Sequence, residues 1–130
     1  MYRWVEHTAE LQLELEAQTE EALFAAALTA FGELVGRDDD GRPARHEVRA
    51  SASDRAALLA EWLGELVFLA ETEGFVPKGV LSFEFDDGAL RAIVEGRRGE
   101  PAHLVKSVTY HNLELAQDGE GWRARVVLDV

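Results

Sequence analysis

Two short polar clusters near the ends of the chain contain the residue types best suited to chemistry. The first is Glu6–Glu10, EHTAE, in which His7 lies between two carboxylates. Imidazole and carboxylate groups so close together could act as a general acid and a general base. The same residue types also satisfy the backbone of a turn. Spacing alone therefore favours a turn and keeps acid–base chemistry as the alternative.

The second cluster is Val105–His111, VKSVTYH, which contains Lys106, one of only two lysines in the chain. After His111 the apolar residues change phase, from even positions such as Val108 to odd positions such as Leu113. Side chains alternate along a strand, so this change predicts a bulge or a bend. Bulges often redirect side chains at functional sites, although many only adjust the twist of a sheet.

A third polar group, the carboxylate of Asp129, is the penultimate residue of the sequence. Alternation predicts that it points away from the face shared by Val126, Leu128 and Val130. Asp129 and the terminal carboxylate of Val130 could then offer neighbouring oxygen ligands, which hard cations prefer. A solvated carboxylate at the end of a strand is the simpler alternative.

The composition narrows the class of protein. A length of 130 residues predicts one domain, residues 1–130, and hydrophobic and charged contents of 47% and 29% are those of a globular chain. The net charge of -12 repels phosphate backbones, which argues against direct, non-specific nucleic-acid binding. The same charge suits a basic protein partner or hard cations, although it also serves simple solubility.

Several classes of site are excluded by the sequence. The chain has no cysteine, which rules out disulfides, thiolate zinc sites and cysteine nucleophiles. It also lacks a phosphate-binding glycine loop at the start of a helix, a GxSxG elbow and an HExxH motif. The N-terminus has no apolar signal core, and no apolar run approaches the roughly 20 residues that span a bilayer. We therefore expect a cytoplasmic protein without a membrane segment.

Two segments have the apolar spacing of amphipathic helices. The first follows Thr19, a typical N-cap residue, and ends at a glycine. The second covers Arg55–Thr72, begins after a cap at Ser53 or Asp54, and ends at Gly74. Both helices should pack their apolar faces against a sheet.

Alternating apolar residues predict several strands. Together with the helices they predict an α+β fold in which two helices pack on one mixed, largely antiparallel β-sheet. The Asp-Asp-Gly turn at 86–88 predicts a hairpin, and EHTA is expected to form the bend between the first two strands. The charged stretches 37–45 and 96–103 are expected to be loops. The predicted strands are Tyr2–Val5, Leu11–Glu16, Val48–Ala52, Leu81–Phe85, Leu90–Val94, a segment from Val105, and Trp122–Val130.

The order of these segments resembles the archease family over nearly the whole chain. The matching pieces are EHTAE, a leucine-rich strand, EEALFAAALTAF, ASDRAALLAEWLGELVFL, VKSVTYH and the terminal VVLDV. Each piece alone is a weak signal, whereas all of them in this order are specific.

The resemblance implies a small protein cofactor that is not itself a ligase. Its partner would be an RtcB-type RNA ligase, which joins RNA ends that carry a 2′,3′-cyclic or 3′-phosphate to a 5′-hydroxyl. Archease-like proteins promote the GTP-dependent guanylylation and the multiple turnover of this ligase in tRNA splicing and RNA repair. Two alternatives stay open: a chaperone-like binding module for an RNA methyltransferase, and a small metal-dependent hydrolase that uses His7, Glu10 and Asp129.

The resemblance also implies which residues act. In this family a divalent cation, typically calcium, is held by the acid that ends the HTA motif and by the penultimate aspartate, here Glu10 and Asp129. Glutamate replaces the family's usual aspartate at the first position, and the terminal carboxylate of Val130 is expected to help. The lysine of the second cluster is expected to meet a nucleotide phosphate or an acidic group of the ligase. The residues implied to face the partner are His7, Lys106 and His111.

Overall fold

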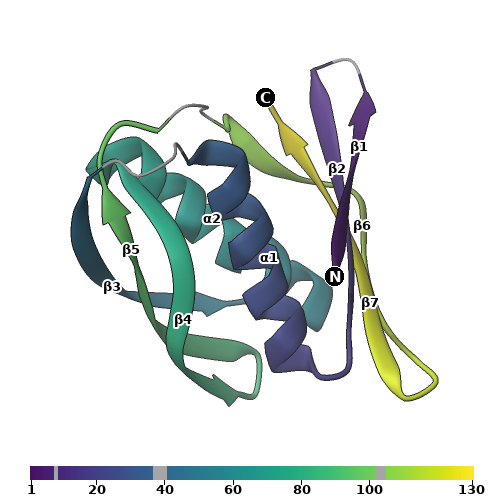
Figure 1. Ribbon diagram of the computed structural model, residues 1–130. Helices are drawn as coiled ribbons and strands as arrows, with labels where there is room; N and C mark the ends of the chain where they lie inside the picture. Colours follow the sequence, from purple (N-terminus) through teal and green to yellow (C-terminus); the bar gives the residue numbers. More distant parts are fainter. Residues whose placement is uncertain (8, 37–40, 102–104) are drawn as a thin grey trace.

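The computed structural model describes residues 1–7, 9–36, 41–101 and 105–130, and it places two helices between two antiparallel sheets (Figure 1). The expected α+β class with two packed helices is confirmed. In chain order the elements are β1 (Tyr2–His7), β2 (Glu10–Ala17), α1 (Glu20–Val35), β3 (Arg42–Ser51), α2 (Arg55–Glu73), β4 (Phe75–Asp86), β5 (Ala89–Arg98), β6 (Ser107–Asp118) and β7 (Gly121–Asp129).

The strands form two sheets where the sequence predicted one. The first sheet has the order β1-β2-β7-β6 and the second the order β3-β5-β4, and every strand pair in the described residues is antiparallel. Each helix packs on both sheets, α1 on β2 and β4, and α2 on β6 and β3. The apolar surfaces of the helices are wide, and a single sheet on one side would leave part of them exposed. The two sheets together cover both sides of the helix pair.

The helices begin and end as the sequence predicted. The side chain of Thr19 accepts a hydrogen bond from the amide of Ala22 at 3.1 Å, and Asp54 accepts one from Ala57 at 2.8 Å. Asp54, and not the serine before it, is therefore the cap of α2. Gly74 ends α2 with a φ of 64°, a left-handed conformation that glycine adopts without strain. In the part of the chain that is described, neither helix is long and apolar enough to cross a membrane.

Three segments expected to be irregular belong to strands. Residues 42–45 form the start of β3, and residues 96–98 form the end of β5, where the two pair from Arg42 opposite Arg98 to Arg45 opposite Glu95. The outer face of this sheet is open to solvent, so a strand there can carry many charges. Glu6 and His7, expected in the EHTA bend, also continue β1, and Thr8 lies outside the described residues. Of the two expected loops, residues 37–40 and 102–103 lie outside the described residues.

The core lies where the helices meet the two sheets. Trp62 of α2 is fully buried, and its indole Nε1 donates a hydrogen bond to the backbone oxygen of Phe24 in α1 at 3.0 Å. Its ring also packs at 5.4 Å from that of Phe83 in β4. One side chain therefore connects both helices with the second sheet.

Candidate functional site

The pairing of β2 with β7 brings the two ends of the chain together. Glu10, the first residue of β2, lies directly opposite Asp129, the last residue of β7. The next backbone contact confirms the register, since the amide of Val130 donates to the oxygen of Ala9 at 3.1 Å. Directly opposed residues on one face have Cβ atoms roughly 4.5–5.5 Å apart. The carboxylates of Glu10 and Asp129 are therefore immediate neighbours.

This pair belongs to a longer row across the first sheet. Ser107 of β6 lies opposite Asp129, and its hydroxyl donates to Asp129 Oδ2 at 3.3 Å. On the other side, the backbone of His7 lies opposite Glu10. We call these four residues, His7, Glu10, Asp129 and Ser107, the terminal row. Lys106 adjoins it, because its amide donates to the backbone oxygen of Asp129 at 2.8 Å.

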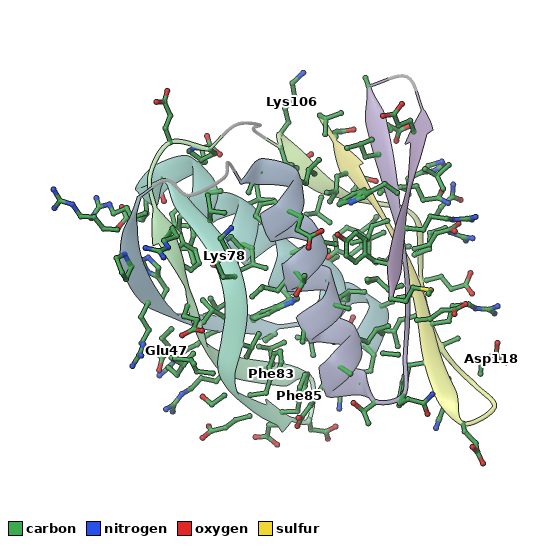
Figure 2. The ribbon with its side chains drawn as sticks, in the orientation of Figure 1. Glu47, Lys78, Phe83, Phe85, Lys106 and Asp118 are labelled. Carbon is green, nitrogen blue, oxygen red and sulfur yellow. The ribbon has the colours of Figure 1, made fainter. Side chains whose placement is uncertain are left out.

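The terminal row lies at an accessible end of the molecule. Glu10 and Asp129 are half-buried, and Val130 is exposed. The Lys106 side chain projects beyond the end of the strands (Figure 2), and it makes no ion pair with a described residue. The positively charged amino group of Lys106 is thus available to a partner.

The predicted bulge in β6 is confirmed and is large. Thr109 pairs with Val127 and Glu114 pairs with Arg125, so residues 110–113 lie opposite Val126 alone. Asn112 takes a φ of 57°, in a left-handed region that asparagine tolerates better than most residues. The exposed side chain of His111 belongs to this bulge and not to the terminal row. The structure therefore separates His111 from the other sequence-predicted site residues.

Comparison with known proteins identifies the family. The sequence model of the Archease protein family matches residues 2–130. The chain belongs to the archease family. It is 31% identical over 139 residues to the protein archease of Methanosarcina mazei, covering 99% of this chain and 95% of that protein.

Solved structures agree with this assignment. The solution structure of protein 1598 of Methanobacterium thermoautotrophicum has a TM-score of 0.72 and 26% identity to this chain, covering 99% of this chain and 98% of that one. The crystal structure of an archease and possible chaperone from Thermotoga maritima has a TM-score of 0.71 and 21% identity, covering 100% and 98%. At 21% identity, the similarity to the Thermotoga maritima structure shows a shared fold alone.

The donors of the terminal row partly fit the divalent cation expected for an archease. Glu10 and Asp129 supply carboxylate oxygens from adjacent strands, which is the donor type that calcium prefers. Calcium takes roughly six to eight oxygen ligands. No group of three or more histidine, aspartate or glutamate side chains suited to a metal occurs within the described residues. Water and other oxygen groups would have to supply the remaining ligands.

The side chain that fixes the bulge, Arg125, was not predicted from the sequence. Arg125 Nε donates to the backbone oxygen of Asn112 at 2.9 Å, and its Nη2 donates to Glu114 Oε2 at 3.1 Å. Arg125 thereby ties β7 to both the bulge and the strand that resumes after it. One signal was present in the sequence, because alternation along the strand predicts that Arg125 lies on the same face as Asp129. Alternation does not predict which groups Arg125 contacts.

Arg125 is itself part of a second row of alternating charge. From β1 to β6 this row reads Arg3, Glu14, Arg125 and Glu114. A hydrogen bond from Arg3 is the largest cause that lowers the pKa of Glu14, and the charge of Arg125 adds to it. Because opposite charges face each other across all four strands, this row supports the sheet beside the bulge.

Proposed function

We propose that this archease-family chain is the protein cofactor of an RtcB-type RNA ligase. It acts in the cytoplasm, is not itself a catalyst, and promotes the GTP-dependent guanylylation and multiple turnover of the ligase in tRNA splicing and RNA repair. The observation that carries the proposal is the register that gathers Glu10, Asp129 and Lys106 at one accessible end. Three motifs far apart in sequence thus converge where a larger protein can reach them.

The charges support a division of labour between the two proteins. A net charge of -12 makes this chain a poor holder of RNA, so the ligase would bind the RNA. Lys106 is exposed and has no described ion-pair partner, which suits contact with a nucleotide phosphate or an acidic group of the ligase. His7 and His111, the other residues implied to face the partner, would also contact the ligase.

A divalent cation, calcium by preference, belongs to the same proposal. Glu10 and Asp129 would hold it, with help from the terminal carboxylate of Val130. The support is the direct opposition of two carboxylates from adjacent strands, which repel each other without a cation between them. A bound cation would offset this repulsion and fix the ends of β2 and β7.

RNA ligation by the cognate ligase, followed at single and multiple turnover, tests the proposal. The wild-type chain should stimulate multiple turnover, and Lys106→Ala and Asp129→Ala should each reduce the stimulation by about tenfold, as loss of an interface hot spot does. Both side chains are at least partly exposed, so in a chelator the unfolding temperatures of both variants should stay within about 3 °C of the wild type. Lys78→Ala, which removes the other lysine, exposed on β4, is the matched control and should retain full stimulation. Unchanged stimulation by both site variants would refute the proposal.

A chaperone-like role for an RNA methyltransferase is the second candidate. The relative from Thermotoga maritima is named a possible chaperone, and two aromatic side chains, Phe68 and Tyr110, are more than half exposed on this chain. A pull-down separates the two functions, because one predicts recovery of a ligase and the other of a methyltransferase. Phosphatase or nuclease turnover by the isolated chain, abolished by a chelator, would instead indicate a hydrolase.

A further inference from the structure

A groove of about 280 Å³ lies between α2 and the beginning of β6. It adjoins the terminal row, because Ser107 lines the groove and also donates its hydroxyl hydrogen bond to Asp129. The residues that matter for its chemistry are Glu61, Gly64, Phe68 and Glu71 from α2, Lys106 just before β6, and Tyr110 within β6.

Two aromatic rings line this groove and remain largely exposed. Phe68 is 57% exposed and Tyr110 is 56% exposed. Helix α2 buries its other large apolar side chains almost completely or packs them against the core, so Phe68 is the exception. A single exposed apolar residue is ordinary, but aromatic residues gathered at one groove are typical of a surface that binds a protein.

Gly64 lies in the middle of α2, where glycine lowers helix stability. A glycine inside a helix can have a packing reason, such as the close approach of a neighbour. Here an ideal Cβ at this position would meet no atom within 4 Å, so internal packing does not require glycine. The missing side chain instead leaves space in the wall of the groove.

The charges around the groove are mainly negative. Glu61 and Glu71 line it, and Lys106 is the one cation among its described lining residues. Partial desolvation, followed by the negative charge of Glu61, raises the pKa of the Tyr110 hydroxyl. The tyrosine therefore stays neutral, and it lines the same groove as the Glu61 carboxylate.

We propose that this groove receives an arginine-bearing segment of the ligase, an inference that rests on the proposed function. A guanidinium group stacks on an aromatic face and pairs with a carboxylate at the same time, which suits a groove that offers Phe68, Tyr110 and Glu61 together. The acidic charge of the chain favours a basic segment. The segment would continue from the groove to the terminal row through Ser107.

The affinity of the full-length chain for the cognate ligase, measured by calorimetry at two salt concentrations, tests the proposal. Phe68→Ala and Glu61→Gln should each weaken binding by about tenfold, and Glu61→Gln should also reduce the salt dependence. The matched controls are Leu81→Ala, which truncates an exposed apolar residue of β4, and Glu65→Gln, an exposed carboxylate of α2 that does not line the groove. Both controls should stay within about twofold of the wild type.

Gly64→Gln separates a docking role from a structural one. Glutamine favours a helix over glycine, so Tm should rise by about 2 °C. The same side chain would occupy the groove, so ligase affinity should fall by about tenfold. If the wild type binds the ligase and the Phe68, Glu61 and Gly64 variants bind it equally well, the groove is not the docking site. The proposed function would then be unaffected. A wild-type chain that neither binds nor stimulates the ligase would overturn both.

Discussion

Removal of the negative charge of Asp129 should make the protein more stable when no divalent cation is present. Asp129 and Glu10 are direct cross-strand partners, and like charges in such positions destabilise a sheet by roughly 0.2–1 kcal/mol. Coulomb's law gives a similar figure, about 0.7 kcal/mol for two charges about 6 Å apart in water. Asp129→Asn keeps an oxygen that can accept the hydrogen bond from Ser107, so little else is lost.

Calcium should reverse the order of stability. For a chain of this length the free energy of unfolding falls by about 0.27 kcal/mol per degree near Tm. Without calcium, the relief of repulsion in Asp129→Asn should therefore raise Tm by about 2–3 °C. Calcium at about 100 times its dissociation constant stabilises a binding protein by about 2.7 kcal/mol. The wild type should then gain about 10 °C, and Asp129→Asn should gain almost nothing.

Thermal unfolding followed by circular dichroism, in a chelator and in calcium, measures both effects. Asp118→Asn is the matched control, because Asp118 lies in the same sheet, at the end opposite Lys106 (Figure 2). It should respond to calcium as the wild type does. Lower stability of Asp129→Asn than of the wild type in the chelator, or an equal shift of both proteins by calcium, would refute the repulsion between Glu10 and Asp129.

Two further substitutions test the forces that hold the fold. The pKa of Glu14 lies below its ordinary value of 4.5 because of Arg3, so Glu14 stabilises the fold above that value and loses this effect as the pH falls through its folded pKa. The difference in Tm between wild type and Glu14→Gln should therefore shrink as the pH falls below 4.5, and a constant difference would contradict this. Trp62→Phe removes the hydrogen bond to Phe24 and leaves a cavity, which should cost about 2–3 kcal/mol in urea unfolding; a loss below about 1 kcal/mol would show that the contact contributes little.

Local elements were predictable because each follows from a short range of sequence. The caps of the two helices and the hairpin at 86–88 depend on neighbouring residues, and all three agree with the structure. The division into two sheets was not predictable, because alternation shows which residues share a face and not which strands pair. The charged start of β3 was not predicted for a related reason. Arg42 and Arg45 can belong to a strand because β5 pairs with them and the outer face of the sheet is open to solvent, and neither condition can be read from the local sequence.

The candidate site was predictable only in pieces. The phase change after His111 predicted a bulge, but its extent depends on the register with β7 and on Arg125, which the sequence does not connect to Asn112. Spacing likewise could not place Glu10 opposite Asp129, because 118 intervening residues separate them in sequence. The order of motifs suggested that Glu10 and Asp129 act together, and the pairing of β2 with β7 shows that they lie opposite each other.

The position of β7 has a consequence for how the protein is made. This strand is the last element of the chain, yet it lies inside the first sheet, between β2 and β6. Until the ribosome has synthesised β7, those two strands have unpaired edges, and Glu10 has no Asp129 beside it. A chain interrupted before β7 would present no terminal row. A partner that recognises this row would therefore distinguish chains in which β7 has paired from fragments that lack it.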